Sequence, residues 1–418
     1  MRVLHVITQK PNSTGSGVYM CGVIKGFKEL GHKQAVIAGI SSNDDENIFD
    51  KDINFYPIKY NTSEIPFEVL GMSDVMPYKS TRYRDLTSEM VNIIKENYRN
   101  IIEKAVNEFK PDIIICNHLY LITALARETV KDIPIYSVCH GTCLRQFKSH
   151  GLEREYIANN IRQLNGVFAL HDEQAIDIVN TLGINEKKVH VLGSGYSDDI
   201  FFKGEELKND CINITYAGKI CKTKGIESFI KSLDKLDYKK ELIKVNVVGD
   251  SGDRQEYEQI LSISNKLDFD VNFTGKVKQN KLADIFRKTH IFVLPSFYEG
   301  LPLVVVEALA CGSNVVTTDL PGLKKYLGKE INDSKKVEYV ELPPMKSIDK
   351  PCENHLPMFE EKLKNAINES VESIIKNNTR NKFIDMEHKS WKGLAVRRNK
   401  EIVHCYYKFN KDYYRKML

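Results

Sequence analysis

The chain has 418 residues, of which 42% are apolar and 28% charged, with a formal net charge of +4. This length favours two domains, and this composition is that of a globular protein. The small net charge, without any run of five or more Lys or Arg residues, argues against a nucleic-acid-binding protein.

The cysteines argue against a disulfide framework. All nine are dispersed and none forms a C-x-x-C pair, so we expect reduced thiols in a cytoplasmic protein. Cys139, His140 and Cys143 lie close together, but no second ligand pair accompanies them, so a metal site is disfavoured. The opening "MRVLHVITQK" lacks the apolar run of a signal peptide, and no stretch reaches the roughly 18 apolar residues of a membrane span.

In the first half of the chain, β-rich apolar runs alternate with segments of helical periodicity. Residues 3–7 predict a strand, and residues 18–31 have the apolar spacing of a helix. Further strands are expected at "KQAVIAG", "PDIIICNH", "IPIYSVCHG" and "GVFALHD", and a helix at "YLITALARETV". Strands that alternate with helices predict a parallel sheet covered on both faces.

The same alternation restarts after residue 210, from "INITYAGK" to "NVVTTD". The segment 193–210 between the two halves is rich in Gly, Ser and charged residues, which is typical of a domain junction. The chain is therefore predicted to form two α/β domains in tandem. Because sites in open parallel sheets form at the carboxyl ends of strands, we expect the domains to face each other across a cleft.

From about residue 355 the strand signal stops, and the chain becomes charged and helical in character. An apolar stripe predicts that the final helix packs on another domain. Its members are Leu394, Val403, Tyr406, Tyr407 and Phe409. The basic, aromatic ending leaves peripheral contact with the inner face of a membrane as the alternative.

The stretch "FVLPSFYEGLPLVVVEALACG", residues 292–312, predicts a strand, a turn and a helix. Pro302 stands near the first position of that helix, where its missing N–H is no loss. The N–H groups of Gly300 and Leu301 have no helical partner, so we expect them to bind an anion or ligand hydroxyls. Glu299 directly precedes this terminus.

Glu307 lies inside the apolar run "VVVEALA", where a carboxylate is costly to bury without a partner. We expect it to accept hydrogen bonds from ligand hydroxyls; a solvated helix residue is the alternative. In a continuous helix, Glu299 and Glu307 would lie about 12 Å apart. A glycosidase pair allows at most about 9.5 Å, so the two glutamates are expected to hold different parts of one ligand.

The stretch "YAGKICKTKG", residues 216–225, predicts an anion site. Gly218 and Lys219 end a strand, and Lys224 and Gly225 open the next helix. Two cations and a helix N-terminus suit a diphosphate. A pair of surface lysines is the alternative, and a Walker A loop is excluded because its motif does not occur.

Two loops of the first half are further candidates. "TGSG" opens the first expected helix, and Gly15 and Gly17 let the backbone approach a ligand. A nicotinamide site is disfavoured, because Met20 replaces the third glycine of that fingerprint and no acidic residue closes the second strand. His140 in "CHGT" ends an apolar strand and can donate to a hydroxyl or oxyanion; a structural histidine is the alternative.

Taken in order, these motifs resemble the GT-B retaining glycosyltransferases, most closely family GT4, the glycosyl transferases group 1. The matching features cover most of the chain: the N-terminal glycine loop, "PDIIICNH", "HGT", "AGK…KG", "VVGD", "FTGKV" and the E-x7-E of "FYEGLPLVVVEALACG". The resemblance implies two Rossmann-like domains around a cleft, with acceptor bound by residues 1–200 and nucleotide-sugar donor by residues 207–391. The final helix, about residues 392–418, would cross back to the first domain.

The resemblance also implies a reaction. A sugar would move from a nucleotide-diphosphate sugar, with UDP-sugar favoured, to an acceptor with retained configuration, by front-face displacement and without a metal or other cofactor. Glu299 looks like the residue that holds the donor-sugar hydroxyls. The implied catalytic residues are Glu299, Lys219, Lys224 and His140. The implied donor-binding residues are Gly15, Gly17, Gly218, Val277, Gly300, Leu301 and Glu307.

The acceptor is open to a glycan, a lipid-linked substrate or a small molecule. Its candidate residues are Asn117, His118, Arg82 and Arg84. The segment "GMSDVMPYKSTRYRDL", residues 71–86, is not typical of the family and places Arg82 and Arg84 among tyrosines. We expect it to bind an anionic or sugar acceptor; a solvated basic loop is the alternative.

The chain departs from the family at several positions. Lys219 stands where Arg is more frequent, so the phosphate contact loses bidentate geometry. The glycine loop is G-S-G instead of a glycine pair, and the Glu usually found after "TTDLPG" is missing. A sugar-nucleotide epimerase and a non-catalytic sugar-nucleotide-binding subunit stay open as alternative functions, and the oligomeric state is open as well.

Overall fold

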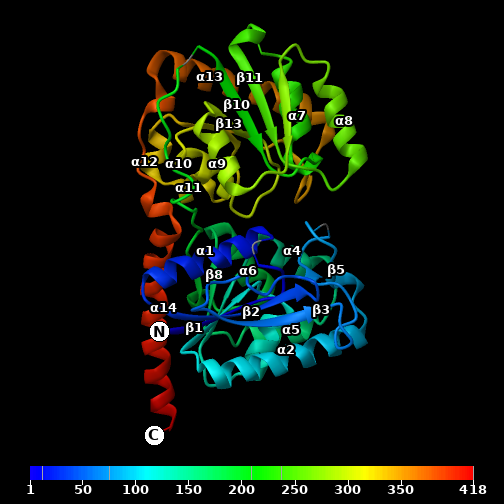
Figure 1. Cartoon of the computed structure of the whole chain (residues 1–418), viewed down its shortest axis with the longest axis vertical. Helices are drawn as coiled ribbons and strands as arrows, with labels where there is room; N and C mark the ends of the chain where they lie inside the picture. Colours follow the sequence, from blue (N-terminus) through cyan, green and yellow to red (C-terminus); the bar gives the residue numbers. More distant parts are fainter. Residues whose placement is uncertain (12, 75, 209, 237, 418) are drawn as a thin grey trace. The chain divides into compact units, whose positions relative to one another are not determined.

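The computed structural model describes residues 1–11, 13–74, 76–208, 210–236 and 238–417. The chain divides into two compact units, one of Met1–Gly195 with Trp391–Leu418 and one of Tyr196–Ser390 (Figure 1). The observed first junction, between Gly195 and Tyr196, lies within the junction segment 193–210 that the sequence indicates and slightly before the predicted domain limit at residue 200. Leu418, the predicted end of the final helix, lies outside the described residues.

Within the described residues, the first unit contains a seven-stranded parallel sheet of order β3-β2-β1-β6-β7-β8-β9. Its strands are β1 (Arg2–Ile7), β2 (Lys33–Ser41), β3 (Asn54–Tyr60), β6 (Ile113–Asn117), β7 (Ile135–Val138), β8 (Gly166–Ala169) and β9 (Val189–Val191). The strand order reverses between β1 and β6, and ligands of open α/β sheets bind at such a reversal.

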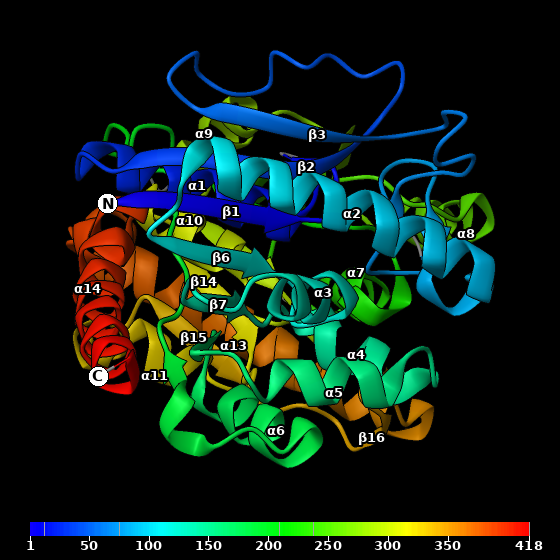
Figure 2. The same ribbon diagram turned by 90° about the horizontal axis from the view of Figure 1, so that it is seen from below.

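Helices cover both faces of this sheet. They are α1 (Gly15–Glu29), α2 (Ser88–Phe109), α3 (Leu121–Thr129), α4 (Gly141–Ser149), α5 (Arg154–Ile161), α6 (Asp172–Leu182) and α14 (Trp391–Met417). Figures 1 and 2 show α2 along one face of β1 and β2, with α1 on the other face. Alternate side chains of β2 follow this arrangement: Ile37 packs in the cluster that holds Ile94 of α2, and Val36 packs with Ile24 of α1.

Helix α14 belongs to the first unit because its first turns pack on α1. The indole of Trp391 fills the space above Gly22, where a Cβ atom would lie 2.2 Å from the ring. A Cβ atom on Gly26 would likewise lie 2.6 Å from that of Ala395. Glycine at both positions therefore lets the two helix backbones approach closely.

Within its described residues, the second unit contains a six-stranded parallel sheet of order β12-β11-β10-β13-β14-β15, which reverses between β10 and β13. Its strands are β10 (Ile212–Ala217), β11 (Ile243–Val248), β12 (Val271–Gly275), β13 (Ile291–Leu294), β14 (Asn314–Thr318) and β15 (Val337–Val340). The prediction of two Rossmann-like units with parallel sheets is confirmed.

Helices cover the second sheet on both faces as well. They are α7 (Ile226–Leu233), α8 (Arg254–Ser264), α9 (Gln279–Arg287), α10 (Leu303–Ala310), α11 (Leu323–Leu327), α12 (Lys329–Asp333) and α13 (Leu356–Asn377). One core cluster contains Phe229 of α7 and Leu363 of α13, and the other contains Phe286 of α9 and Val305 of α10. Smaller ladders join β4 (Leu70–Gly71) to β5 (Thr81–Arg82) and β16 (Met345–Ser347) to β17 (Lys350–Pro351).

In the two main sheets, the strands that the sequence did not predict are β3, β9 and β15, and all three are edge strands. An edge strand is half solvated, so its apolar pattern is interrupted. Strand β3 also contains Pro57, which a central strand would exclude because proline has no N–H to donate to the ladder.

The apolar stripe predicted on the final helix is only partly buried. Leu394 is fully buried, but Tyr407 is 68% exposed. The prediction that Tyr407 lies in a docking face is therefore wrong. Val403, Tyr406 and Phe409 are half-buried. In the described part of the chain, no helix combines the length and the hydropathy needed to cross a bilayer.

Replacement of Trp391 by alanine is expected to lower the free energy of unfolding by about 3–5 kcal/mol, because it empties the space above Gly22 and beside Gly195. Chemical denaturation followed by circular dichroism measures this loss. The control is Val396→Ala on the same helix, whose side chain is 41% exposed; a change within about 0.5 kcal/mol is expected there. Equal effects of both variants would contradict the packing role of Trp391.

Candidate functional site

In the second unit, Lys224 and Glu299 meet beside the strand reversal. Lys224 ends the turn after β10, and Glu299 lies in the turn after β13. Lys224 Nζ lies 2.6 Å from Glu299 Oε1 and donates to the carbonyl oxygen of Tyr298 at 3.3 Å. Ser296 Oγ donates to the same carboxylate oxygen at 2.9 Å. The carboxylate and the ammonium are thus held at one sheet edge with part of each side chain exposed.

Gly225 makes this meeting of two turns sterically feasible. Its φ is +65°, and a Cβ atom there would lie 2.0 Å from the carbonyl oxygen of Pro295. The backbone N–H of Phe297 also donates to the carbonyl oxygen of Thr223 at 3.1 Å, which ties the two turns together. A side chain at Gly225 would force the turns apart and separate Lys224 from Glu299.

Lys219 and Val277 follow strands β10 and β12, which lie on either side of β11. Gly218 and Lys219 follow β10 directly, and Gly218 N–H donates to the carbonyl oxygen of Val248 at 3.0 Å. The Lys219 side chain is exposed and forms no ion pair with any described residue. Val277 follows β12 and is half-buried. Lys219 therefore has a free ammonium, whereas that of Lys224 is already paired.

Glu307 lies in the second turn of α10 and is only 9% exposed. No described residue donates a hydrogen bond to its carboxyl group. Burial raises the pKa of this carboxyl to about 7. The structure therefore does not support the alternative of a solvated glutamate.

The turn before α10 leaves backbone donors free. Pro302 caps the helix, and the N–H groups of Gly300 and Leu301 find no acceptor among the described residues. Both residues are half-buried. Free N–H groups at the start of a helix favour a negatively charged or hydroxyl-bearing ligand.

In the first unit, the glycine loop is held by its own hydroxyl groups. Thr14 caps α1 by accepting the N–H of Gly17 at 3.1 Å. Thr14 and Ser16 both donate to Gln9 Oε1, at 3.0 and 2.9 Å. A Cβ atom on Gly15 would meet open space, so packing does not require glycine there.

Two histidines join this loop from β6 and β7. His118 Nε2 lies 2.8 Å from Ser16 Oγ, and His140 Nε2 lies 3.2 Å from Asn117 Oδ1. The two imidazole centroids are 4.9 Å apart. Burial is the main cause that holds the pKa of His140 well below its ordinary value, and electrostatic repulsion from His118 and then from Arg398 adds to it. The structure therefore brings four of the predicted residues into one cluster: Gly17, Asn117, His118 and His140.

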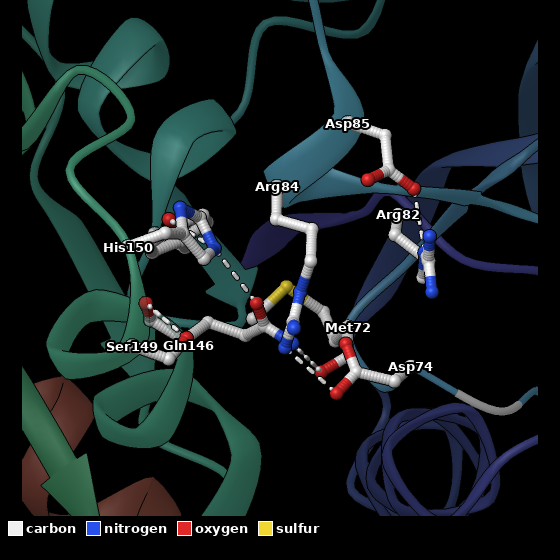
Figure 3. Close-up of polar contacts among 9 residues, drawn as sticks. Met72, Asp74, Arg82, Arg84, Asp85, Gln146, Ser149 and His150 are labelled. Carbon is white, nitrogen blue, oxygen red and sulfur yellow. Dashed lines mark hydrogen bonds and ion pairs between the residues drawn. The ribbon is translucent and has the colours of Figure 1, made fainter.

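The arginines of the segment 71–86 lie in a separate group (Figure 3). Arg84 Nη2 lies 2.8 Å from Asp74 Oδ2, and Arg82 Nε lies 2.5 Å from Asp85 Oδ2. Both arginines are exposed, and each forms an ion pair with an acidic neighbour that neutralises its charge. The segment is anchored to α4 by Gln146, whose Nε2 donates to the carbonyl oxygen of Met72 at 3.0 Å.

Several polar residues of these clusters were missed by the sequence analysis. They are Gln9, Ser16, Tyr19, Ser296 and Arg398. Ser16 stands inside the "TGSG" motif, and its hydroxyl is the sequence signal for this polar cluster. Among the described residues, no three His, Cys, Asp or Glu side chains gather as metal ligands would.

Two family models match adjoining parts of the chain. The model of the glycosyl transferases group 1 matches residues 197–334, and that of the Glycosyltransferase Family 4 matches residues 13–199. An uncharacterized glycosyltransferase of Methanocaldococcus jannaschii is 29% identical over 172 residues, which are 38% of this chain and 43% of the relative. The chain spans about two fifths of the length of the first curated relatives it matches.

Solved structures resemble the chain over almost its full length. A sucrose-phosphate synthase from Thermosynechococcus elongatus has a TM-score of 0.64 at 13% identity, and the match covers 97% of this chain and 99% of that one. The Anabaena protein HepE in complex with UDP and glucose has a TM-score of 0.62 at 12% identity, with 100% and 99% covered. At such identities, the likeness shows the fold alone.

The buried carboxyl of Glu307 predicts a pH-dependent stability. Its pKa of about 7 in the folded chain lies above the ordinary 4.5, so the folded state retains a proton that the unfolded state loses. The free energy of unfolding should therefore fall from pH 5 to pH 8 by up to about 3 kcal/mol relative to Glu307→Gln. Urea denaturation of both proteins across this range measures the difference. Parallel pH profiles would contradict the burial of an unpaired carboxyl.

Proposed function

The chain belongs to the glycosyl transferases group 1, family GT4, with the GT-B fold, and on that premise we propose that it transfers a sugar from a nucleotide-diphosphate sugar to an acceptor hydroxyl. One observation carries the proposal. Lys224 and Glu299 form a 2.6 Å ion pair beside the strand reversal of the second sheet. A cation for a diphosphate and a carboxylate for sugar hydroxyls thus stand together where such sheets bind ligands.

The donor would be held by groups of the second unit. The diphosphate would bind the free ammonium of Lys219. It would also compete with Glu299 for the ammonium of Lys224. Glu299, released from this cation, would accept hydroxyls of the sugar, and the N–H groups of Gly300 and Leu301 would support them. Glu307 would accept the two ribose hydroxyls, because a buried carboxylate without donors can take both.

The proposed reaction needs no protein nucleophile. The acceptor oxygen attacks the anomeric carbon on the face that the diphosphate leaves, and the bond from this carbon to the diphosphate oxygen breaks. The electron pair stays on the diphosphate, which also takes the acceptor proton. Catalysis then consists of positioning and of the stabilisation of negative charge by Lys219 and Lys224.

Three finer features belong to this proposal. A UDP-sugar is favoured as donor, in line with the UDP bound by the structural neighbour HepE. Retention of configuration is proposed because displacement from the front face preserves it. Independence of metal is proposed because two lysines offer the leaving group its positive charge.

A donor panel tests the proposal. In EDTA, we expect slow nucleotide release from one of a set of UDP-, GDP- and ADP-sugars. Release should be at least tenfold slower in Glu307→Ala, because the ribose hydroxyls lose the carboxylate that accepts their hydrogen bonds. The control is Glu330→Ala, an exposed glutamate of α12, which should match the wild type. Release that requires a divalent cation would refute metal independence. If no donor bound by calorimetry, the transferase assignment itself would fail.

The arginines of the segment 71–86 give a second test. If they bind an anionic acceptor, the double variant Arg82→Ala/Arg84→Ala should raise the acceptor KM at least tenfold with little change in the donor KM. Each arginine has only an exposed ion pair to break, which is worth at most about 1 kcal/mol. Lys104→Ala on the exposed side of α2 is the control. An unchanged acceptor KM would mean that the segment 71–86 is a solvated loop that does not bind the acceptor.

A further inference from the structure

Arg398 of α14 is a buried cation without an anion. Its side chain is 1% exposed, and it forms no ion pair with a carboxylate of any described residue. The guanidinium lies 5.0 Å from the ring centroid of Phe168 and donates to the hydroxyl of Tyr19, while its Nε has no hydrogen-bond partner. Burial of an unpaired charge is costly, so packing alone does not account for an arginine at this position.

Tyr19 connects this cation to the histidine cluster. Its hydroxyl accepts from Arg398 and donates to the carbonyl oxygen of Gly193 at 3.4 Å. Its ring meets His140 edge to face, with centroids 5.0 Å apart and planes at 85°. On its other side the ring meets Trp391 at 5.5 Å and 90°. These contacts hold the phenol ring of Tyr19 in one orientation against the imidazole of His140.

Among the described residues, none of those in contact with His140 is a carboxylate. Asn117 Oδ1 can only accept, so Nε2 of His140 carries the proton of a neutral ring. His118 lies against the same ring, and Cys143 Sγ accepts the backbone N–H of His140 at 3.2 Å. The thiol of Cys139 precedes it, Tyr19 covers it from α1, and Arg398 stands behind Tyr19.

We propose that Arg398 and Tyr19 are positioning residues for His140: Arg398 holds the Tyr19 hydroxyl, and the Tyr19 ring fixes the imidazole plane in which Nε2 donates its proton to Asn117. The inference rests on the proposed function and on the contact with the donor sugar that the family resemblance implies for His140. Positive charge develops on that sugar in the transition state of glycosyl transfer. A neutral imidazole can lie beside it, whereas an imidazolium would repel it.

Nuclear magnetic resonance of the full chain labelled with ¹⁵N-histidine tests the proposal without any substrate. The tautomer of His140, assigned by the loss of its signals in His140→Gln, is read at pH 7 and pH 5. In the wild type we expect one neutral tautomer, protonated on Nε2, at both values. In Arg398→Met the single tautomer should give way to mixed tautomers, because the freed Tyr19 no longer fixes the ring against Asn117. Tyr19→Phe should show mixed tautomers, because it removes only the hydroxyl that anchors the guanidinium.

The matched control is Lys400→Met, which removes a positive charge from the exposed side of the same helix and should retain the wild-type spectrum. If Arg398→Met does not fold, Tyr19→Phe decides the matter. Wild-type His140 signals in every folded variant would overturn the proposal. Since the spectra need no donor, failure of the proposed function would not imitate either result.

Discussion

Both candidate clusters depend on the reversal of strand order in a parallel sheet. At the reversal, the connections from the two central strands leave toward opposite faces, so the strand ends between them stay uncovered. The loops after β1 and β6 bring Ser16 to His118, and the turns after β10 and β13 bring Lys224 to Glu299. Each sheet builds its polar cluster from residues that lie far apart in the chain.

The buried charges of the chain fall into two kinds. Lys336 is fully buried, but its ammonium donates to the carbonyl oxygens of Gly312, Thr379 and Arg380, and Arg380 in turn donates to the carbonyl oxygen of Cys311. Lys336 is thus satisfied, whereas Nη1 of Arg380 has no hydrogen-bond partner. Together the two cations hold the end of α10 to the segment after α13. Glu307 on the same helix is buried without such partners, which is the condition expected of a group that awaits a ligand.

The first unit is completed by the last part of the chain. Trp391 and Arg398 of α14 both contact Tyr19 of α1, and Tyr19 contacts His140. The packing that anchors α14 therefore also limits the orientations open to a candidate catalytic side chain. The glycines of α1 allow this approach, since any larger residue at Gly22 would collide with the indole.

The sequence by itself determined the alternation of strands and helices, the two-unit organisation and the positions of Glu299 and Glu307, because local periodicity and turn residues encode them. It did not determine the edge strands β3, β9 and β15, whose pairing depends on a neighbour more than on an apolar run. Only the tertiary structure decided that Lys224 pairs with Glu299, that Glu307 is buried, that acidic residues neutralise Arg82 and Arg84, and that Arg398 reaches Tyr19. Burial and pairing are properties of side chains brought together by folding, and no local pattern records which distant residues will meet.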